Sequence, residues 1–428
     1  MSVRIGLLGC GIVGGATARI LEVHAAELQQ RAGTAIELRK VAVRSLSKPR
    51  PVDLPADMWT TDPWEVVKDP EIDVVVEVIG GIEPAKDLIL EAFSNGKHVV
   101  TANKELLANL GKEVMDAAEA SGKDLLFEAS VGGGIPIIRP MKESLAGDRV
   151  RRVMGIVNGT TNFILTRMSD TGMTFAEALA EADSLGYTEM DPSADIEGFD
   201  AASKLAILSS LAFNARVIAG DVAREGISRV TPADISAAHE LGYEVKLLAV
   251  AEMDDGAVSA RVHPAMLPKT HPLASVRDVY NAVFVEGEQT GELMFFGRGA
   301  GGGPTGSAVV GDIVEIARNI RNGARGIGCT CYHSAARIRP MDEAKVRYYV
   351  VLSVTDQPGV LASVAGVFAS NEVSIASVRQ EGAGDEATLM LITHTATEGA
   401  HRATFVQLGE LSTVRSIMSS MRVEGAPE

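Results

Sequence analysis

Short apolar runs and longer segments with helical spacing alternate through the first third of the chain. The runs are rich in Val and Ile without polar alternation, which is typical of parallel strands buried on both faces. The segments between them repeat apolar residues three and four positions apart, as amphipathic helices do. This order predicts an α/β domain with a Rossmann-like, doubly wound parallel sheet. The strands are expected at 3–8, 36–43, 73–79, 97–101 and 125–129, and the helices at 16–28, 84–95 and 106–121.

From about Pro140 the regular alternation ends, and the mixture of short strands and helices predicts an α+β second domain. A later helix over 304–321 carries an apolar stripe, so we expect it to return and pack on the first domain. The stripe consists of Val309, Ile313, Ile316 and Ile320. The strands of this part are expected at 151–157, 244–254 and 258–263, and the helices at 161–170, 174–185 and 199–213.

The C-terminal part has the order strand, helix, strand, strand, helix, strand, which is the ferredoxin-like arrangement. The segment before it, from Asn322 to Met341, has weak periodicity and is interpreted as a linker. The strands are expected at 346–354, 375–381, 387–393 and 414–423, with helices ending near 370 and spanning 400–411.

A glycine motif follows the first expected strand and opens the first helix. Gly9, Gly11 and Gly14 form G-x-G-x-x-G, with Ile12 and Val13 in the last gap. In this strand–turn–helix setting the glycines allow a tight turn and bring the backbone close to a pyrophosphate at the helix N-terminus. We therefore expect a dinucleotide cofactor here. A second glycine-rich loop, which includes Gly302, offers further backbone N–H groups at the start of the returning helix.

The end of the second strand lacks the acidic residue that usually binds the ribose of NAD. Arg44 and Lys48 follow instead, in R-S-L-S-K. Two cations suit a 2′-phosphate and thus NADP, although a solvated basic turn explains them equally well.

Two further segments are expected at the ligand edge of the first sheet. Thr101 and Lys104 come at the carboxyl end of a parallel strand, where doubly wound sheets bind their ligands. The glycine cluster at 132–134 marks irregular backbone at a domain junction, with carbonyl oxygens free to coordinate a ligand.

The segment from Leu185 to Leu211 begins as an acidic turn and continues as a helix from about Phe199. Asp200 and Lys204 are four residues apart, so their side chains share one helical face. That face continues with apolar residues, which predicts a half-buried pair whose ammonium points into a cleft. A surface ion pair of little energetic consequence is the alternative.

Composition narrows the range of partners and compartments. The chain has 428 residues and a net charge of −16, which argues against nucleic acid or an anionic membrane surface. No apolar run reaches the roughly 18 residues of a membrane-spanning helix. The three cysteines are too few for a disulfide framework, which indicates a reducing, cytoplasmic location. Cys329 and Cys331 lack a second Cys/His pair that would indicate zinc.

Six motifs occur in a consistent order along the chain. They are G-C-G-I-V-G at 9–14, T-A-N-K at 101–104, E-A-S-V-G-G-G-I-P at 128–136, N-G-T-T-N-F-I-L at 158–165, the segment 189–204, and G-G-G-P-T at 301–305. Together they resemble bacterial homoserine dehydrogenase from residue 1 to about 320. D-Q-P-G-V-L at 356–361 resembles the ACT domain, a module that binds small amino acids.

The resemblance implies reversible hydride transfer between L-homoserine and L-aspartate 4-semialdehyde, with NAD or NADP. It makes Lys204 the acid/base at the substrate hydroxyl. It assigns substrate binding to Glu189 and Asp200, with support from Asp195. It places Lys104 beside the nicotinamide and the substrate.

The resemblance also implies a monovalent-cation site, with Na⁺ expected. Its ligands would be Glu128 and the carbonyl oxygens of Val131, Gly133 and Ile135, a donor set that suits a hard cation. A purely structural turn is the alternative reading.

The implied assembly is a homodimer or homotetramer, and the implied effector of the ACT domain is L-threonine. The ACT domain could instead serve dimerisation only. Two other functions stay open on the residues alone. One is a related amino-acid dehydrogenase, and the other is a non-enzymatic amino-acid sensor.

These expectations divide the chain into four parts. The dinucleotide-binding domain covers 1–135 and is completed by the returning helix 304–321. The catalytic and dimerisation domain covers 136–303, the linker 322–344, and the ferredoxin-like ACT domain 345–428.

Overall fold

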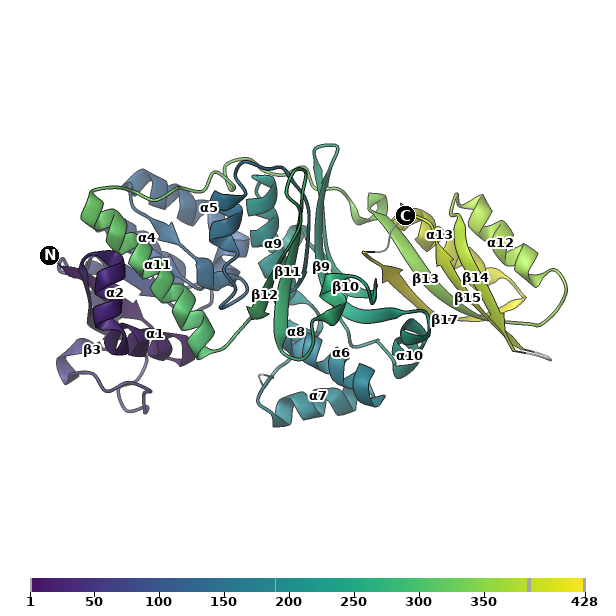
Figure 1. Cartoon of the computed structure of the whole chain (residues 1–428), viewed down its shortest axis with the longest axis horizontal. Helices are drawn as coiled ribbons and strands as arrows, with labels where there is room; N and C mark the ends of the chain where they lie inside the picture. Colours follow the sequence, from purple (N-terminus) through teal and green to yellow (C-terminus); the bar gives the residue numbers. More distant parts are fainter. Residues whose placement is uncertain (1, 189, 383–385, 426–428) are drawn as a thin grey trace.

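The computed structural model describes residues 2–188, 190–382 and 386–425. The molecule is elongated, with the N-terminal sheet at one end, a mixed sheet in the middle and the C-terminal sheet at the other end (Figure 1). No helix in these described ranges is long and apolar enough to cross a membrane.

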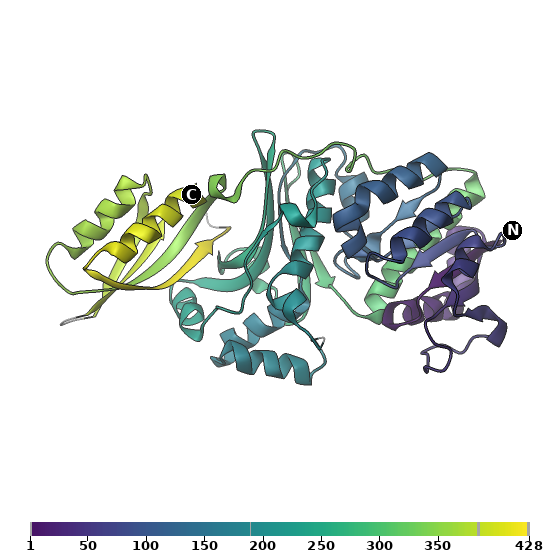
Figure 2. The same ribbon diagram turned by 180° about the vertical axis from the view of Figure 1, so that it is seen from behind.

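The N-terminal sheet is parallel, with strand order β3-β2-β1-β4-β5-β6. Its order reverses between β1 and β4, so the ligand crevice of a doubly wound sheet lies at the carboxyl ends of these strands. Helices cover both faces, with α1 and α11 on one side and α4 and α5 on the other (Figures 1 and 2). The strands are β1 Ser2–Leu8, β2 Ala35–Ala42, β3 Trp59–Thr60, β4 Val74–Glu77, β5 His98–Thr101 and β6 Leu125–Leu126. The helices are α1 Ile12–Val23, α2 Ala25–Ala32, α3 Pro63–Lys68, α4 Ala85–Ser94 and α5 Lys104–Ser121.

Two expectations for this part were wrong in detail. The helix predicted over 16–28 begins at Ile12 and is divided at His24 into α1 and α2. The last strand ends at Leu126 instead of Ala129, and a 3₁₀ turn over Glu128–Ser130 follows it.

The returning helix is confirmed as α11, Gly302–Asn322. Val309, Ile313 and Ile316 are fully buried in one hydrophobic cluster with residues of β1. This burial joins a late segment of the chain to the first domain, as the apolar stripe predicted, and the contact is with its sheet.

The middle part is a mainly antiparallel sheet, in which the short β8 pairs in parallel with β10, and helices pack against it. The hairpin of β11 and β12 and the helix α10 were not predicted, and β10 extends five residues beyond the expected end at His263, to Pro268. The strands are β7 Val150–Ile156, β8 Ala223–Arg224, β9 Tyr243–Asp254, β10 Ala257–Pro268, β11 Tyr280–Gly287 and β12 Gly291–Arg298. The helices are α6 Gly159–Thr171, α7 Phe175–Ser184, α8 Ser193–Ile196, α9 Phe199–Phe213 and α10 Pro232–Glu240.

The C-terminal part has the predicted ferredoxin-like order, with sheet order β17-β13-β15-β14 and both helices on one face (Figure 2). Its edge strand β17 also pairs in parallel with β10, where Met266 lies opposite Val423. The middle and C-terminal sheets are therefore one continuous sheet. The elements are β13 Lys345–Val354, α12 Val360–Ser370, β14 Ile375–Glu381, β15 Ala387–Thr393, β16 Ala396–Thr397, α13 Glu398–Glu410 and β17 Val414–Val423.

The segment between α11 and β13 is more than a flexible linker, and residues 323–340 of it are called the strap below. The strap is docked on the molecule, with Cys331 and Tyr332 fully buried. Cys329 and Cys331 form a disulfide, a single bond that the expectation of no disulfide framework did not foresee. The expectation came from the number of cysteines, which cannot show that two of them are held side by side.

Candidate active site

A cavity of about 580 Å³ lies where the N-terminal sheet meets the middle part. Its volume is in the range of small-molecule and cofactor sites. Its walls bring together segments that are far apart in the sequence. They include Val13, Lys104, Ser130, Gly133, Asn158, Thr160, Tyr187, Asp195, Asp200, Lys204, Asn281, Arg298 and Thr305.

The glycine motif makes the compact turn that a dinucleotide needs. Gly9 has φ +98°, a conformation that favours glycine. A Cβ on Gly14 would lie 2.1 Å from the carbonyl oxygen of Gly9, so only glycine fits there. Gly302 packs on Ile12, with 3.1 Å between its Cβ position and the Ile12 carbonyl oxygen. The starts of α1 and α11 therefore converge, and their free N–H groups suit a pyrophosphate.

The basic turn after β2 is solvent-exposed at both predicted positions, Arg44 and Lys48. Arg50, which the sequence analysis did not single out, lies closer to the glycine loop. Its guanidinium donates to the carbonyl oxygens of Cys10, at 3.0 Å, and Ser45, at 2.8 Å. Arg50 thus ties the basic turn to the glycine loop.

The end of β5 positions Lys104 at the start of α5. Asn103 caps this helix by accepting from the Leu106 amide at 3.0 Å, and its own amide group donates to Gly81. The Thr101 hydroxyl is buried and donates to the Glu77 carboxylate at 2.6 Å. The Thr101 side chain therefore stabilises the strand ends, and only its backbone could face a cofactor.

The Asp200 carboxylate lies between two lysines. Lys204 Nζ is 2.7 Å from Asp200 Oδ2 and also donates to the carbonyl oxygen of Val157 at 2.7 Å. Lys104 Nζ is 3.1 Å from Asp200 Oδ1. The side chains of Asp200 and Lys204 are 10% and 12% exposed, against 42% for Lys104. The predicted half-buried pair is therefore present, and it lines the cavity.

Asn158 connects Asp200 to a second carboxylate. Its amide nitrogen donates to Asp195 Oδ1 at 2.6 Å and to Asp200 Oδ2 at 2.9 Å. Its oxygen accepts from the Thr161 amide, which fixes the side chain at the start of α6. In the sequence, Asn158 opens the motif N-G-T-T-N-F-I-L, and no role for it was predicted. Its place before a helix made it a recognisable cap, but its link to the two aspartates depends on the fold.

The two carboxylates differ in their electrostatics. Burial raises the pKa of Asp200, but the charges of Lys204 and Lys104 outweigh burial and hold that pKa well below its usual range. Burial also raises the pKa of Asp195, and the nearby charge of Asp200 adds to this rise although Asn158 opposes it. Asp200 is therefore the firmly ionised member, and Asp195 is the one that takes up a proton first. Glu189, the other predicted substrate ligand, lies outside the described residues.

Asn281 is a cavity residue that the sequence analysis missed. It is 1% exposed and lines the cavity from β11. Its Oδ1 atom has no hydrogen-bond partner among the described residues. Because β11 was not predicted, the sequence offered no signal that would place Asn281 here.

The expected cation site has a different donor arrangement from the one predicted. The Glu128 carboxylate accepts three backbone N–H groups, from Ile137, Ile138 and Arg139, at 2.7–2.9 Å. It is therefore already bound by the turn that follows it. In the described parts of the chain, no group of three His, Cys, Asp or Glu side chains could hold a metal ion. Val131, Gly133 and Ile135 still form an irregular turn, and Gly133 borders the cavity.

A doubly wound sheet with a glycine cradle, joined at its carboxyl edge to a lysine–carboxylate pair, is the arrangement of an NAD(P)-dependent dehydrogenase. Comparison with known families agrees with this class. The family described as homoserine dehydrogenase matches residues 136–314, the homoserine dehydrogenase NAD-binding domain matches 9–128, and the ACT domain matches 348–400.

Individual relatives match over nearly the whole chain. A homoserine dehydrogenase of Mycobacterium tuberculosis is 50% identical over 434 residues, which cover 99% of this chain and 98% of that protein. The crystal structure of a homoserine dehydrogenase from Thiobacillus denitrificans has a TM-score of 0.92 at 40% identity and 99% coverage of both chains. A hyperthermophilic archaeal homoserine dehydrogenase in complex with NADPH has a TM-score of 0.64 at 31% identity, covering 74% of this chain and 98% of that one.

The chain belongs to the homoserine dehydrogenase family. It interconverts L-homoserine and L-aspartate 4-semialdehyde by hydride transfer with NAD(P), a step in the biosynthesis of threonine, methionine and isoleucine.

Proposed function

We propose that Lys204 transfers the proton in this reaction and that Asp200 and Lys104 position it. Bound NAD(P) supplies or accepts the hydride. As an ammonium held by Asp200, Lys204 can donate a proton to the carbonyl oxygen of the aldehyde; as an amine, it can accept the hydroxyl proton of homoserine. The observation that carries this proposal is the 2.7 Å contact between Lys204 and Asp200 at the cavity wall.

The substrate is an amino acid, so its ammonium group needs carboxylates. Asp195 and Asp200 supply two in the same cavity, joined through Asn158. Glu189 is assigned a substrate-binding role on the family resemblance alone. Arg44 and Lys48 support binding of NADP as well as NAD, and the related archaeal enzyme was solved with NADPH.

A monovalent cation, Na⁺, is proposed at the turn after Glu128. The carbonyl oxygens of Val131, Gly133 and Ile135 accept no hydrogen bond from the described residues, which supports their role as ligands. Glu128 would contribute through its carbonyl oxygen more readily than through its carboxylate, because the carboxylate already accepts three N–H groups.

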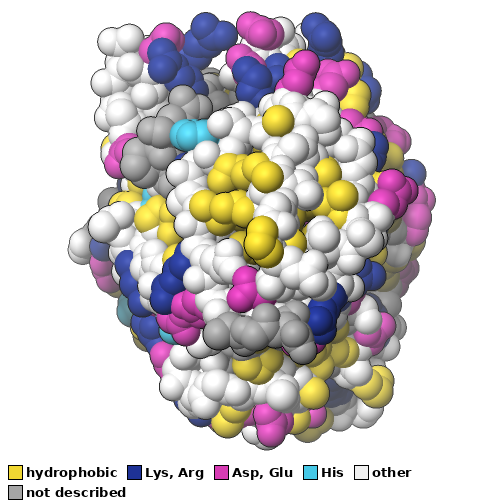
Figure 3. All heavy atoms as spheres, turned by 90° about the vertical axis from the view of Figure 1, so that its right-hand side faces the viewer, with side chains coloured by type: hydrophobic (Ala, Val, Ile, Leu, Met, Phe, Trp, Pro, Cys, Tyr) yellow, Lys and Arg dark blue, Asp and Glu magenta, His cyan; other side chains and the backbone are white. Residues whose placement is uncertain are grey.

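The C-terminal ACT domain is proposed to bind L-threonine and to take part in a homodimer or homotetramer. Gly359, with φ +92°, is the residue immediately before α12, so its turn presents free N–H groups to a ligand carboxylate. Strand β14 forms the outer edge of the sheet, and apolar side chains gather at this end of the molecule (Figure 3). Exposed apolar residues of the domain include Leu361 and Val378. A role in dimerisation alone is the alternative.

We also propose a cytoplasmic location and four parts of the chain, with boundaries at 1–135 with 304–321, 136–303, 322–344 and 345–428. They do not affect the proton chemistry assigned to Lys204.

Replacement of Lys204 by alanine tests the central assignment. Loss of the proton-transfer group should lower kcat by about 10²–10⁴-fold, while circular dichroism should show a folded protein. Lys112→Ala is the matched control, because Lys112 pairs with Asp116 on the exposed side of α5. A Lys204→Ala enzyme with wild-type kcat would exclude the role.

A further inference from the structure

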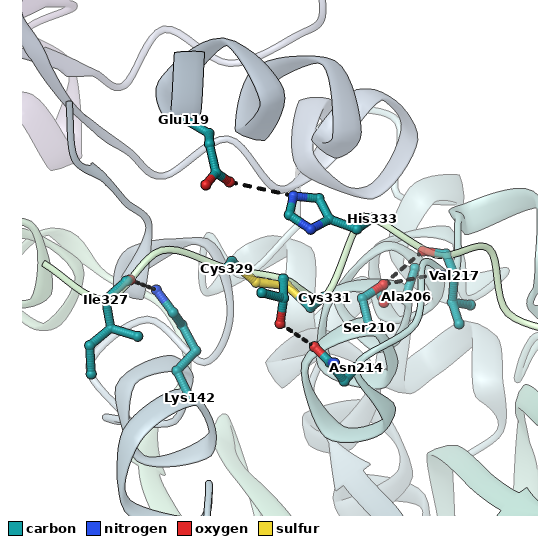
Figure 4. The surroundings of a disulfide bond; sticks show 11 residues. Glu119, Lys142, Ala206, Ser210, Asn214, Val217, Ile327, Cys329, Cys331 and His333 are labelled. Atoms are coloured by element: carbon teal, nitrogen blue, oxygen red, sulfur yellow. Dashed lines mark hydrogen bonds and ion pairs between the residues drawn. A yellow bond between two sulfur atoms is a disulfide. The ribbon is translucent and has the colours of Figure 1, made fainter. Parts of the chain in front are cut away.

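The strap crosses from the nucleotide-binding end to the ACT domain and is fastened along its length. Near its start, Lys142 Nζ donates to the Ile327 carbonyl oxygen at 3.0 Å. Further along, the Thr330 hydroxyl donates to Asn214 at 2.7 Å, and His333 lies 3.4 Å from Glu119. The Cys329–Cys331 disulfide lies in the middle of these contacts (Figure 4).

The residue after the disulfide is anchored between two helices that carry the active site. The ring of Tyr332 lies on Gly111 of α5, where a Cβ would come within 2.7 Å of it. Burial raises the pKa of Tyr332, whose hydroxyl lies near Ser210 of α9 but has no hydrogen-bond partner among the described residues. Tyr332 therefore touches both helices.

These helices carry three active-site residues at their N-terminal ends. Lys104 is the first residue of α5, and Asp200 and Lys204 lie in the first turns of α9. The two helices pack against each other and share one hydrophobic cluster with Cys331 and Tyr332. The strap thus holds the middle of α5, at Gly111, and the C-terminal end of α9, at Asn214, in the helices that position the proton-transfer group.

We propose that Cys329 and Cys331 are a reversible dithiol–disulfide pair that sets how firmly the strap clamps α5 against α9. A small dithiol reduces the disulfide to the two thiols, and a disulfide of the glutathione type oxidises the two thiols back to the disulfide. The disulfide form is the tighter and more active one, because the bond restricts the chain next to Tyr332.

Reduction of the disulfide by a dithiol starts at Cys329, and its atoms and electrons balance. Cys331 is 2% exposed whereas Cys329 is half-buried, so a thiolate of the dithiol attacks Sγ of Cys329. The bond between the cysteines breaks, and Cys331 leaves as a thiolate that takes up a proton. The second thiol of the reagent then displaces Cys329, which also takes up a proton. The reagent ends as its disulfide, and its two electrons reside in the two protein thiols.

The test compares the full-length enzyme after dithiothreitol with the enzyme after oxidised glutathione. Alkylation in denaturant should label three cysteines in the reduced form and only Cys10 in the oxidised form. Hydrogen–deuterium exchange over 326–336 and the second half of α5 should be several-fold faster in the reduced form. The kcat should be lower in the reduced form by on the order of tenfold, as expected when catalytic groups are less well positioned.

Two variants sharpen the comparison. The Cys329→Ser/Cys331→Ser enzyme should match the reduced form under both treatments. Thr330→Val, which loses the Asn214 contact but keeps both cysteines, should still respond. Equal rates of hydrogen exchange and equal kcat values in the reduced and oxidised wild-type enzymes would overturn the proposal, even if the double variant fails to fold. Hydrogen exchange does not depend on turnover, so this outcome is distinct from a failure of the role assigned to Lys204.

Discussion

Lys104 and Asp200 belong to opposite walls of the active-site cavity, yet their charged groups lie 3.1 Å apart. Lys104 begins α5 behind the nucleotide-binding sheet, and Asp200 lies at the start of α9 against the middle sheet. The same carboxylate also holds Lys204. The ionised Asp200 carboxylate therefore holds the ammonium groups of both lysines, one from each side of the cavity.

Replacing Asp200 by asparagine should lower kcat/KM for homoserine by about 100-fold or more, since the proton-transfer lysine loses its positioning partner. In a double-mutant cycle with Lys104→Met, the two losses should be non-additive by roughly 1–3 kcal/mol, as for residues in direct contact. The measurement is steady-state kinetics of the four enzymes. Strict additivity would mean that the Lys104–Asp200 contact does not matter to turnover.

The acid limb of the pH profile should report Asp195. Its pKa is raised by burial, whereas that of Asp200 is held low by the lysines, so Asp195 is protonated first as the pH falls. A protonated Asp195 no longer attracts the substrate ammonium. We expect kcat/KM to fall with an apparent pKa above the ordinary value of about 3.9, and Asp195→Asn to remove this limb. A limb that persists in the variant belongs to another group.

The parts of the fold that were predicted correctly are those in which the residue type alone shows whether a position is buried. Strand β4 reads V-V-V-E and is buried throughout, as its apolar run indicated. Strand β10 differs, because Arg261 and His263 look like exposed positions in the sequence. They are 2% and 1% exposed, and Glu424, far along the chain, lies against both of them. Such burial depends on a partner that local pattern does not reveal.

The same distinction applies to the active site. The Asp200–Lys204 pair follows from helical spacing, and the position of Lys104 follows from strand topology. The bridge through Asn158 needed the three-dimensional arrangement of α6, α8 and α9. Helix α10 is a different case, because a local signal was present and overlooked. Thr231 and Asp234 form a capping box at its start.

Arg44 should contribute more to NADP than to NAD binding. It is exposed after β2, at the position where a 2′-phosphate is read in this fold. Arg44→Ala should raise KM for NADP by about tenfold, in line with a lost charge-assisted hydrogen bond of 1.5–3 kcal/mol, and change KM for NAD little. Arg39→Ala is the control, since Arg39 lies on β2 and pairs with the exposed Glu71. Equal losses for both cofactors would show that Arg44 does not contact the 2′-phosphate.

Glu424 should stabilise the junction between the middle sheet and the ACT domain. It is buried and pairs with Arg261 at 2.8 Å and with Arg152. Although burial raises its pKa, the charges of Arg261 and Arg152 hold that pKa well below its usual range. Removing one partner of a buried pair leaves the other uncompensated, so Glu424→Gln should lower the free energy of unfolding by about 3 kcal/mol at pH 7.

The contribution of Glu424 to the free energy of unfolding should decrease as the pH falls. The stabilisation by Glu424 is present above its unfolded-state pKa of about 4.3 and is lost as the pH falls toward its lower folded-state pKa. The difference between the wild type and Glu424→Gln in urea unfolding should therefore narrow below about pH 4. The exposed Glu410→Gln serves as the control. A difference that stays constant to pH 3 would contradict an ionised Glu424.

Inhibition by L-threonine should depend on the turn before α12. At φ +92°, Gly359 adopts a conformation that L-residues rarely take, so Gly359→Ala displaces the N–H groups proposed to bind the effector carboxylate. We expect at least a tenfold rise in the threonine concentration for half-inhibition, which equals about 1.4 kcal/mol of lost binding. Activity without threonine should change little. Gly366→Ala is the matched control, because Gly366 lies within the same helix and a Cβ there meets open space.

Point substitutions are preferable to removing the domain, since truncation would strip β17 from β10 and leave Arg261 without Glu424. If the wild type is indifferent to millimolar threonine, the domain does not sense this amino acid. If both glycine variants remain fully inhibited, the effector binds elsewhere in the molecule.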